Sequence, residues 1–382
     1  MQLQPRIVDL FCGCGGFSLG AHSAGFKTAV AFDIDSNLTA SQSNNFPNTT
    51  LSLADISTLT GADIKREIGE PVDGVIGGPP CQAFSSIGRR IKNDPRRSLL
   101  GHFYRLVGEI DPAFFIMENV KGLGYTDALP VLEDAISTLP SKYAIVGPIV
   151  LDAADFGAAT KRERLFVIGY DPERMEPLSE EDIDGAKTEP TTVRDAIGDL
   201  AGARQIEDED DFDVWKLDGR KRVSAYAARM LNEDGTFTGH LPTVHSSAVI
   251  ERFEKVEQGG IDRVGRHPRL DWDGQCPTLR AGTGSDHGSY QSVRPIHPVE
   301  NRVITVREAA RLQGFPDSFR FHPTKWHSFR MIGNSVSPII SEALFKLIKA
   351  QLKVPQLEPE PESEPAETAD SEKALEHAEA AE

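Results

Sequence analysis

Short runs of apolar residues alternate with amphipathic stretches over the first 170 residues of the chain. Unbroken apolar runs are typical of buried strands, whereas apolar positions that recur every three or four residues are typical of helices. Because the runs are short and separated by helical stretches, we expect a mainly parallel sheet with helices on both faces. The predicted strands span residues 6–11, 28–33, 50–53, 74–76, 113–118, 144–151 and 165–170, and the predicted helices span 19–24, 37–44, 99–110 and 128–138.

The pattern changes after Tyr170. Residues 171 to about 275 are polar and acidic and lack a strong period, which predicts a smaller domain whose internal structure the pattern does not give. Two further helices are expected at 305–315 and 337–352, and the second of these closes the first domain. The predicted domains are therefore 1–170 completed by 325–352, a small domain at 171–300, and an acidic tail at 353–382 that should be disordered.

Composition and charge narrow the class of protein. The chain is 39% hydrophobic and 26% charged, as in an ordinary globular protein. It has no unbroken apolar run of about 18 residues, so we expect no membrane span and a cytoplasmic location. The net charge of −17 is unusual for a protein that binds nucleic acid, but ten acidic residues and one lysine lie from Val354 onward. Arginines cluster elsewhere, at 89–97, 162–164 and 263–280, so the charge distribution still allows a nucleic-acid partner.

Glycines follow the first predicted strand, in Asp9-Leu10-Phe11-Cys12-Gly13-Cys14-Gly15-Gly16, where a helix is expected to begin. Such a turn at the carboxyl end of a parallel strand lets the backbone approach a ligand closely. On the next two strands, Asp33 could hold the hydroxyls of a ribose and Asp55 could accept from an adenine amino group, with Ile34 against the adenine face. Each aspartate could equally be a helix cap or a turn residue. Their order along successive strands favours the nucleoside site.

One of the four cysteines stands in an unusual context. Cys12, Cys14, Cys81 and Cys276 do not look like a disulfide framework, and their spacing does not favour zinc, so we predict no metal. Cys81 follows Pro79 and Pro80, which fix the backbone ahead of the thiol, and its neighbours do not look like a core strand. A buried structural cysteine is the ordinary alternative. As a nucleophile, Cys81 would need activation by a positive field, because a free thiol is mostly protonated at neutral pH.

Two charged segments come after the later strands. Glu118 ends the apolar fifth strand, where burial should raise the pKa of its carboxyl and let it donate to a ring nitrogen; a helix cap is the alternative. Arg162 and Arg164 precede the seventh strand at a spacing that points both guanidinium groups the same way. Such a pair suits a phosphate or a pyrimidine carbonyl, and a solvated basic turn is the alternative.

Seven segments follow one another along the chain: DLFCGCGG, GGPPCQAFS, MENV, KRERLFVIG, PTLRAGTG, RLQGFPDSF and GNSV. In this order they resemble the motif series of the cytosine-5 DNA methyltransferases. Any one motif is suggestive, whereas seven in family order are very specific. The resemblance extends to about residue 350 and leaves 171–268 without a family motif.

The resemblance implies an α/β, Rossmann-like fold of the S-adenosylmethionine-dependent methyltransferases, with one antiparallel strand in the sheet and a small target-recognition domain ahead of Pro277. Carried over position by position, the nucleophile falls on Cys81 and the ring-nitrogen acid on Glu118. The target-base arginine falls on Arg164, with Arg162 supporting the same loop. Contacts to the methyl donor, S-adenosylmethionine, fall on Phe11, Gly13, Gly15, Asp33, Ile34, Asp55, Pro79, Leu99, Asn334 and Val336.

One position departs from the family pattern. The family commonly has glutamine two residues before the first arginine, whereas this chain has Thr160. A loop contact to Cys81 or to DNA that the pattern implies therefore does not carry over directly.

The resemblance implies methyl transfer to C5 of a cytosine that has been flipped out of duplex DNA, through a covalent bond between Cys81 and C6. The expected partners are double-stranded DNA and a cognate restriction endonuclease, and we expect a monomer. Two alternatives remain open: a cytosine-5 methyltransferase that acts on tRNA, and a catalytically silent DNA-binding protein of the same fold. The region without family motifs favours DNA, but the recognised base sequence cannot be inferred from the chain.

Overall fold

The computed structural model describes residues 4–69, 71–80, 97–126, 128–209, 211–217, 223–282 and 293–353. Three features of the sequence analysis lie outside these ranges. They are Cys81 with the arginines that follow it up to Arg96, the end of the PTLRAGTG segment from Thr283 onward, and the acidic tail from Val354.

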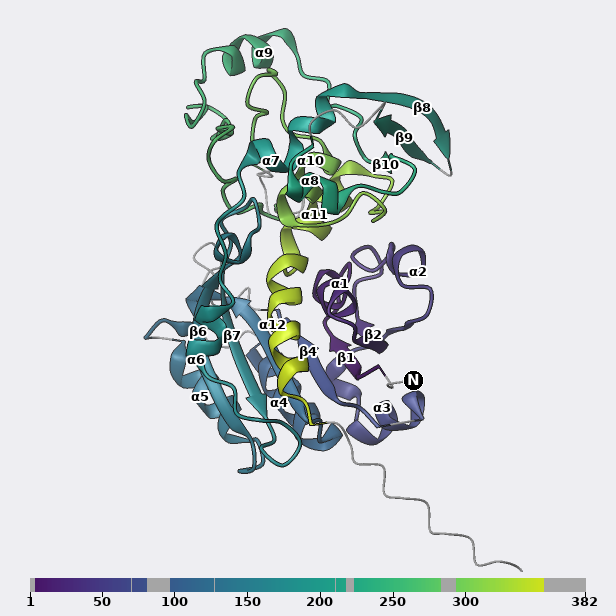
Figure 1. The fold of residues 1–382 in the computed structure, drawn as a ribbon, viewed down its shortest axis with the longest axis vertical. Helices are drawn as coiled ribbons and strands as arrows, with labels where there is room; N and C mark the ends of the chain where they lie inside the picture. The colour runs from purple at the N-terminus through teal and green to yellow at the C-terminus, as the bar shows by residue number, and fades with distance from the viewer. Residues whose placement is uncertain are drawn as a thin grey trace, which may run out of the picture. The chain divides into compact units, whose positions relative to one another are not determined.

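Seven strands form one sheet in the order β3-β2-β1-β4-β5-β7-β6 (Figure 1). The first five pair in parallel, and β7 is antiparallel to both of its neighbours. The mainly parallel sheet agrees with the sequence pattern, and its one antiparallel strand agrees with the family resemblance. Each predicted strand occurs, with its ends within two residues of the prediction. The bounds are β1 Arg6–Leu10, β2 Lys27–Asp33, β3 Thr50–Leu53, β4 Gly74–Gly77, β5 Phe114–Val120, β6 Ala144–Asp152 and β7 Glu163–Tyr170.

Helices cover both faces of this sheet. Three of them, α3 Gly61–Ile68, α4 Arg97–Ile110 and α5 Leu129–Ser137, contribute to one hydrophobic core. On the other face, α1 Gly16–Ser23 and α12 Pro338–Gln351 contribute to a second core. The last helix of the fold thus lies beside the first one, as predicted.

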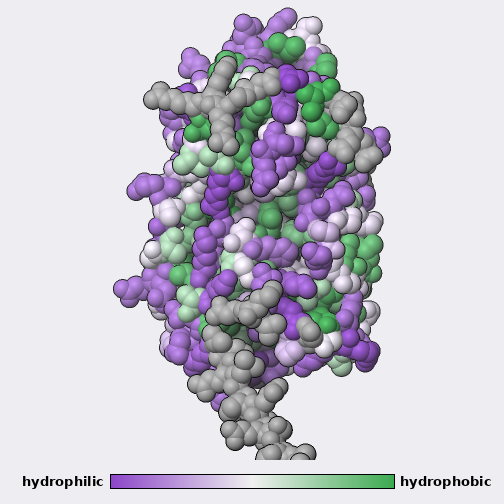
Figure 2. Space-filling model, turned by 45° about the vertical axis from the view of Figure 1, so that its right-hand side comes forward, coloured by the Kyte–Doolittle hydropathy of each residue, from purple (hydrophilic) through white to green (hydrophobic). Residues whose placement is uncertain are grey.

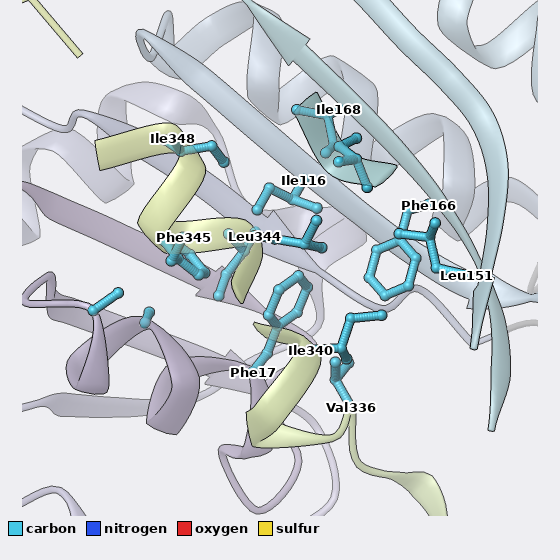
Figure 3. Packing of buried hydrophobic residues seen from close by; sticks show 14 of the residues in the cluster. Phe17, Ile116, Leu151, Phe166, Ile168, Val336, Ile340, Leu344, Phe345 and Ile348 are labelled. Carbon is cyan, nitrogen blue, oxygen red and sulfur yellow. The ribbon is translucent and has the colours of Figure 1, made fainter. Parts of the chain in front are cut away.

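Figure 3 shows how α12 packs on the sheet. Ile340, Leu344 and Phe345 point toward Phe17 of α1 and Ile116 of β5, and all of these side chains are buried. The ring of Phe345 meets that of Phe17 edge to face at a centroid distance of 6.1 Å. Burial of each such side chain contributes about 1.5–3 kcal/mol. The C-terminal helix is therefore an integral part of the sheet's core.

In the large domain, one predicted helix is much shorter in the structure, and one helix of the structure was not predicted. The helix expected at 37–44 is reduced to α2, Gln42–Asn45, because the Asp35 carboxylate accepts from the backbone of Asn37 and Leu38 and holds a turn instead. The helix α3 was not predicted, although Thr60 and Asp63 form a capping box at its start. Its few buried positions, Gly61 and Ile64, gave too weak an apolar pattern.

The region after Tyr170 is ordered rather than irregular. An antiparallel sheet in the order β10-β9-β8 comprises β8 Ala203–Glu209, β9 Phe212–Leu217 and β10 Thr236–Thr238. The helices are α6 Glu180–Gly185, α7 Val193–Ile197, α8 Ala225–Met230, α9 Ser247–Glu254, α10 Val306–Gln313 and α11 Lys325–Asn334. Three residues that follow Tyr170 pack with α12 in the core of the large sheet; they are Met175, Leu178 and Ile183. The start of this region therefore belongs to the large domain.

A buried ionic cluster organises α10. Arg311 is fully buried, and its guanidinium donates to both carboxylate oxygens of Asp317 at 2.7 Å. It also reaches Asp199 at 3.3 Å, next to α7. Because a buried guanidinium needs partners for its charge and its N–H groups, this cluster fixes α10 against α7.

The surface is mostly polar. On the face shown in Figure 2, hydrophilic residues predominate and hydrophobic ones form small, separate groups. Within the described ranges, no helix has the length and hydropathy that a membrane crossing requires.

Candidate active site

A pocket of about 660 Å³ lies at the carboxyl edge of the large sheet. Its walls come from the residues that follow β1 to β4, from the end of β5, from the start of β7 and from the segment between α11 and α12. Because β7 is antiparallel, its first residues reach the same edge as the last residues of the other strands. The lining includes Phe11, Gly13, Asp33, Ile34, Asp55, Pro79, Leu99, Glu118, Arg162, Arg164, Asn334 and Val336.

The structure thus brings together twelve of the fourteen residues that the sequence singled out. Cys81 lies outside the described residues, but Pro79 and Pro80, which precede it directly, are in the lining. Gly15 is not in the lining. It precedes α1 with a φ of 89°, and a Cβ there would lie 2.4 Å from the ring of Phe46, so both the backbone conformation and the packing require glycine.

The glycine turn after β1 is fixed to β2. The backbone N–H of Gly13 donates to Oδ2 of Asp33 at 2.8 Å, and that of Asp35 donates to Oδ1 at 2.9 Å. Burial raises the pKa of Asp33, and these backbone donors oppose the rise. Each carboxylate oxygen keeps further acceptor capacity, so Asp33 can also accept from a ligand's hydroxyls.

Asp55 and Ile34 form the outer part of the pocket. Asp55 caps a short 3₁₀ turn by accepting from the backbone N–H of Ser57 at 2.9 Å, a bond that lowers the pKa of its carboxyl. The capping alternative is therefore realised while the residue still lines the pocket. Ile34 is 73% exposed, and an apolar side chain exposed on a pocket wall suits contact with a flat ring.

The reactive corner is built from β4, β5 and β7. Nε of Arg164 lies 3.0 Å from Oε1 of Glu118 in an ion pair, and burial raises the pKa of Glu118 while Arg164 opposes the rise. The side-chain amide of Asn119 donates to the carbonyl of Pro79 at 3.0 Å. A Cβ at Gly78 would lie 3.2 Å from Oε2 of Glu118. The Gly78-Pro79-Pro80 turn is therefore held beside the Glu118 carboxyl.

The other cysteines are poor candidates for a nucleophile. Cys12, Cys14 and Cys276 are all buried, and burial raises the pKa of each thiol, that of Cys14 to about 12. Such thiols stay protonated and unreactive at neutral pH. Among the described ranges, no group of three or more His, Cys, Asp or Glu residues is arranged to hold a metal ion.

Comparison with known proteins places this geometry in a family. A family model described as "C-5 cytosine-specific DNA methylase" matches residues 5–350. The chain belongs to this family. It is a DNA cytosine-5 methyltransferase, and membership of this family implies S-adenosylmethionine as the cosubstrate.

Individual relatives cover most of the methyltransferase. Type II methyltransferase M.XorII of Xanthomonas oryzae pv. oryzae is 40% identical, over 92% of this chain and 87% of its own length. Type II methyltransferase M.DdeI of Desulfomicrobium norvegicum is 33% identical, over 90% and 88%. A crystal structure of a prophage-encoded E. coli protein, described as a DNA modification methyltransferase, superposes with a TM-score of 0.77 and 37% identity, over 91% and 99%.

The two arginines of the methyltransferase have different surroundings. Arg162 is 2% exposed and donates to the carbonyls of Leu279 at 3.3 Å and Gly333 at 3.0 Å. Arg164 instead pairs with Glu118. Both residues line the pocket, but their partners differ: Arg162 joins distant segments of the chain, and Arg164 pairs with Glu118 in the reactive corner.

Thr160, where the chain departs from the family pattern, has a defined role in the packing. It is fully buried, and its hydroxyl donates to the carbonyl of Cys276 at 3.2 Å. The neighbouring N–H of Lys161 donates to the same carbonyl at 2.8 Å. The segment before Arg162 is therefore tied to the one that leads to Leu279.

Sequence reasoning missed Asp9. Its side chain is fully buried in the pocket wall, where Ser18 donates to Oδ2 at 2.6 Å and Oδ1 has no hydrogen-bond partner among the described residues. Burial raises the pKa of Asp9 to about 7. A polar residue within an otherwise apolar strand was the available signal.

Proposed function

We propose that the methyltransferase modifies one specific cytosine of duplex DNA through a covalent bond between Sγ of Cys81 and C6 of a flipped base. The observation that supports this most strongly is the hydrogen bond from Asn119 to the carbonyl of Pro79. It fixes the turn that precedes Cys81 against the strand end that carries Glu118. Pro79 and Pro80, the two residues that precede Cys81, both line the pocket that contains Glu118, which supports this assignment.

The chemistry assigns each group a task. The Cys81 thiolate adds to C6, and the electron pair of the C5–C6 bond moves toward N3 and the exocyclic carbonyl. A protonated Glu118 transfers its proton to N3 as negative charge develops there, and Arg164 donates to the carbonyl at C2 while holding the Glu118 carboxyl in place. S-adenosylmethionine would supply the methyl group: C5 attacks the methyl carbon, the bond from that carbon to the sulfonium breaks, and S-adenosylhomocysteine leaves. Loss of the C5 proton to solvent then restores the C5–C6 double bond, expels the Cys81 thiolate and returns the N3 proton to Glu118.

The pocket fits the proposed methyl donor. Asp33 would accept from both ribose hydroxyls, Ile34 would cover one face of the adenine, and Asp55 would accept from the adenine amino group. Among the described residues Oδ1 of Asp9 has no hydrogen-bond partner, and this free acceptor in the pocket wall supports the binding of a cationic ligand. The remaining proposed contacts are Phe11, Gly13, Pro79, Leu99, Asn334 and Val336, with Gly15 acting through the shape of the turn.

Residues 171–300 would supply target recognition, and contacts from this region would offset the cost of flipping the base, which is on the order of a few kcal/mol. Because the relatives are named as Type II methyltransferases, we further propose that a restriction endonuclease reads the same DNA sequence. Plasmid DNA from cells that express the methyltransferase should then resist that endonuclease and carry 5-methylcytosine at the resistant sites.

The substrate assignment is tested by incubating the purified protein with labelled S-adenosylmethionine and, separately, with duplex DNA and tRNA. We expect transfer to duplex DNA, loss of transfer in Cys81→Ala and retention in Cys276→Ala, whose thiol is buried away from the proposed chemistry. Transfer to tRNA but not to DNA would contradict the proposal, and so would full transfer by Cys81→Ser.

A further inference from the structure

A short loop beyond α9 is held in one conformation by a single carboxylate. In this Asp262 loop, residues 261–267, Asp262 is 1% exposed and accepts from the backbone N–H of Val264 at 3.3 Å and of Gly265 at 2.7 Å. Nε of Arg252, at the end of α9, lies 2.9 Å from Oδ1 of Asp262 in an ion pair. The backbone also closes on itself, because the N–H of Asp262 donates to the carbonyl of His267 and the N–H of Arg266 to that of Asp262, both at 2.9 Å.

The base of the Asp262 loop is anchored by a buried arginine. The guanidinium of Arg269 donates to the carbonyls of Phe253 at 2.6 Å and His297 at 2.9 Å, and to Oδ1 of Asn301 at 2.8 Å. The N–H of Arg269 donates to the carbonyl of Gly260 at 2.9 Å. A buried guanidinium with this many acceptors resists displacement, so the loop stands on a rigid base.

The tip of the loop presents side chains outward. Arg263, Val264 and Arg266 are exposed, Val264 by 74%, and within the described part of the chain neither guanidinium has a hydrogen bond or an ion pair. Arg266 has a φ of 60°, a conformation that costs a non-glycine residue on the order of 1 kcal/mol or more. The hydrogen bond from the N–H of Arg266 to the carbonyl of Asp262 thus holds the backbone of the loop in a strained conformation, while the exposed Arg266 guanidinium is available to a ligand.

A continuous segment connects this loop with the reactive corner. The carbonyls of Trp272 and Gly274 accept from the start of α7, and Cys276 is hydrogen-bonded in both directions to the segment from Ala159 to Lys161. Leu279, at the end, accepts from Arg162. In Figure 1, α9 lies beyond α7 and α10 as seen from the large sheet, so the segment spans the region between the loop and the pocket.

We propose that the Asp262 loop reads the DNA sequence, with Arg266 donating two hydrogen bonds to a guanine edge in the major groove and Val264 contacting a neighbouring base. This inference rests on the proposed duplex-DNA substrate. Arginine bound to O6 and N7 of guanine is the commonest specific contact of this groove, and apolar side chains contact the thymine methyl group there. Arg263, at the edge of the loop, contacts the phosphate backbone.

The test measures sequence preference rather than activity alone. The wild-type protein and the variants Arg266→Gly and Arg266→Lys are incubated with a random duplex library, and methylated cytosines are mapped by sequencing. Glycine keeps the positive φ and lysine keeps the charge, so neither variant should unfold the loop, which a thermal melting curve verifies. Arg66→Lys, on α3, is the matched control because its side chain is 76% exposed.

We expect both Arg266 variants to lose discrimination at one base pair of the wild-type site by about tenfold, while the control keeps the wild-type pattern. Arg263→Ala should slow methylation of all sequences alike and reduce its dependence on salt. If both Arg266 variants keep the wild-type preference, or slow all sequences equally, base reading by Arg266 is wrong. If the wild type methylates no DNA, the proposed function itself fails, and the two failures are thus distinguishable.

Discussion

Glu118 is 7% exposed, and its Oε1 is paired with Arg164 without a hydrogen-bond partner among the described residues. Burial favours the protonated carboxyl, and Arg164 favours the ionised one, so the two effects oppose each other at a single group. At the scale of residues, the motifs in the sequence identified this pair. They could not show that Arg162 is buried, because its partners Leu279 and Gly333 lie 117 and 171 positions away.

Glu118→Gln should lower the rate of methyl transfer by roughly 10²–10⁴-fold, because an amide can donate a hydrogen bond to N3 but cannot transfer a proton. The wild-type rate should fall as pH rises through the raised pKa of Glu118, since only the protonated form donates. Single-turnover rates across pH, with binding of S-adenosylmethionine measured by calorimetry as the control, check both points. A variant with the wild-type rate and pH profile would remove Glu118 from the mechanism.

Asp9→Asn tests the buried carboxyl. Because the folded state raises the pKa of Asp9 from 3.8 to about 7, the unfolded chain loses this proton at lower pH than the folded one. The stabilisation by the protonated group is therefore complete below pH 4 and lost as pH rises through 7. Between pH 5 and pH 8, urea unfolding should show the wild type losing roughly 2–3 kcal/mol relative to the variant. Parallel stability curves would show that Asp9 titrates normally.

At the scale of elements, apolar runs predicted all seven strands of the large sheet. Four of them, β1, β4, β5 and β7, are almost wholly buried, whereas the edge strands β3 and β6 are partly exposed. Helices with few buried positions, such as α3, gave no comparable pattern. The four-residue α2 was overestimated, because the local turn at Asp35 competes with the helix. The helix α12 was predicted from its apolar positions. Its contacts with α1 and β5 could not be predicted in this way, because these elements are far from α12 in the sequence.

Phe345→Ala should destabilise the fold by about 3–5 kcal/mol, because Phe345 is fully buried against the rings of Phe17, Phe26 and Phe114. Lys346→Ala, at the next position of α12, is the control and should change stability by about 1 kcal/mol or less, since Lys346 is 63% exposed. Both values come from urea unfolding. Equal effects of the two substitutions would show that α12 does not belong to the core of the sheet.

At the scale of the whole molecule, the net charge of −17 does not indicate a DNA substrate. The order of the motifs along the chain does indicate one. The fold brings segments near residues 11, 33, 79, 118, 164 and 334 to one pocket, which fits the predicted nucleoside and cytosine sites. The structure of the region from 171 to 300 could not be predicted in detail. Its buried apolar residues, such as Ile197 and Phe237, pack with α10 and α11, and Asp199 pairs with Arg311 of α10. These partners are distant in sequence, so they leave no local period that a sequence pattern could show.

The most direct test of the central claim is the mass of the protein after incubation with S-adenosylmethionine and duplex DNA that carries 5-fluorocytosine at the target position. Fluorine at C5 blocks the final elimination, so the thiolate cannot leave. We predict a denaturation-resistant species whose mass equals protein plus the methylated strand, with the bond mapped to Cys81 and no such species in Cys81→Ala. An active wild-type protein without this adduct, or an adduct that persists in Cys81→Ala, would contradict the account.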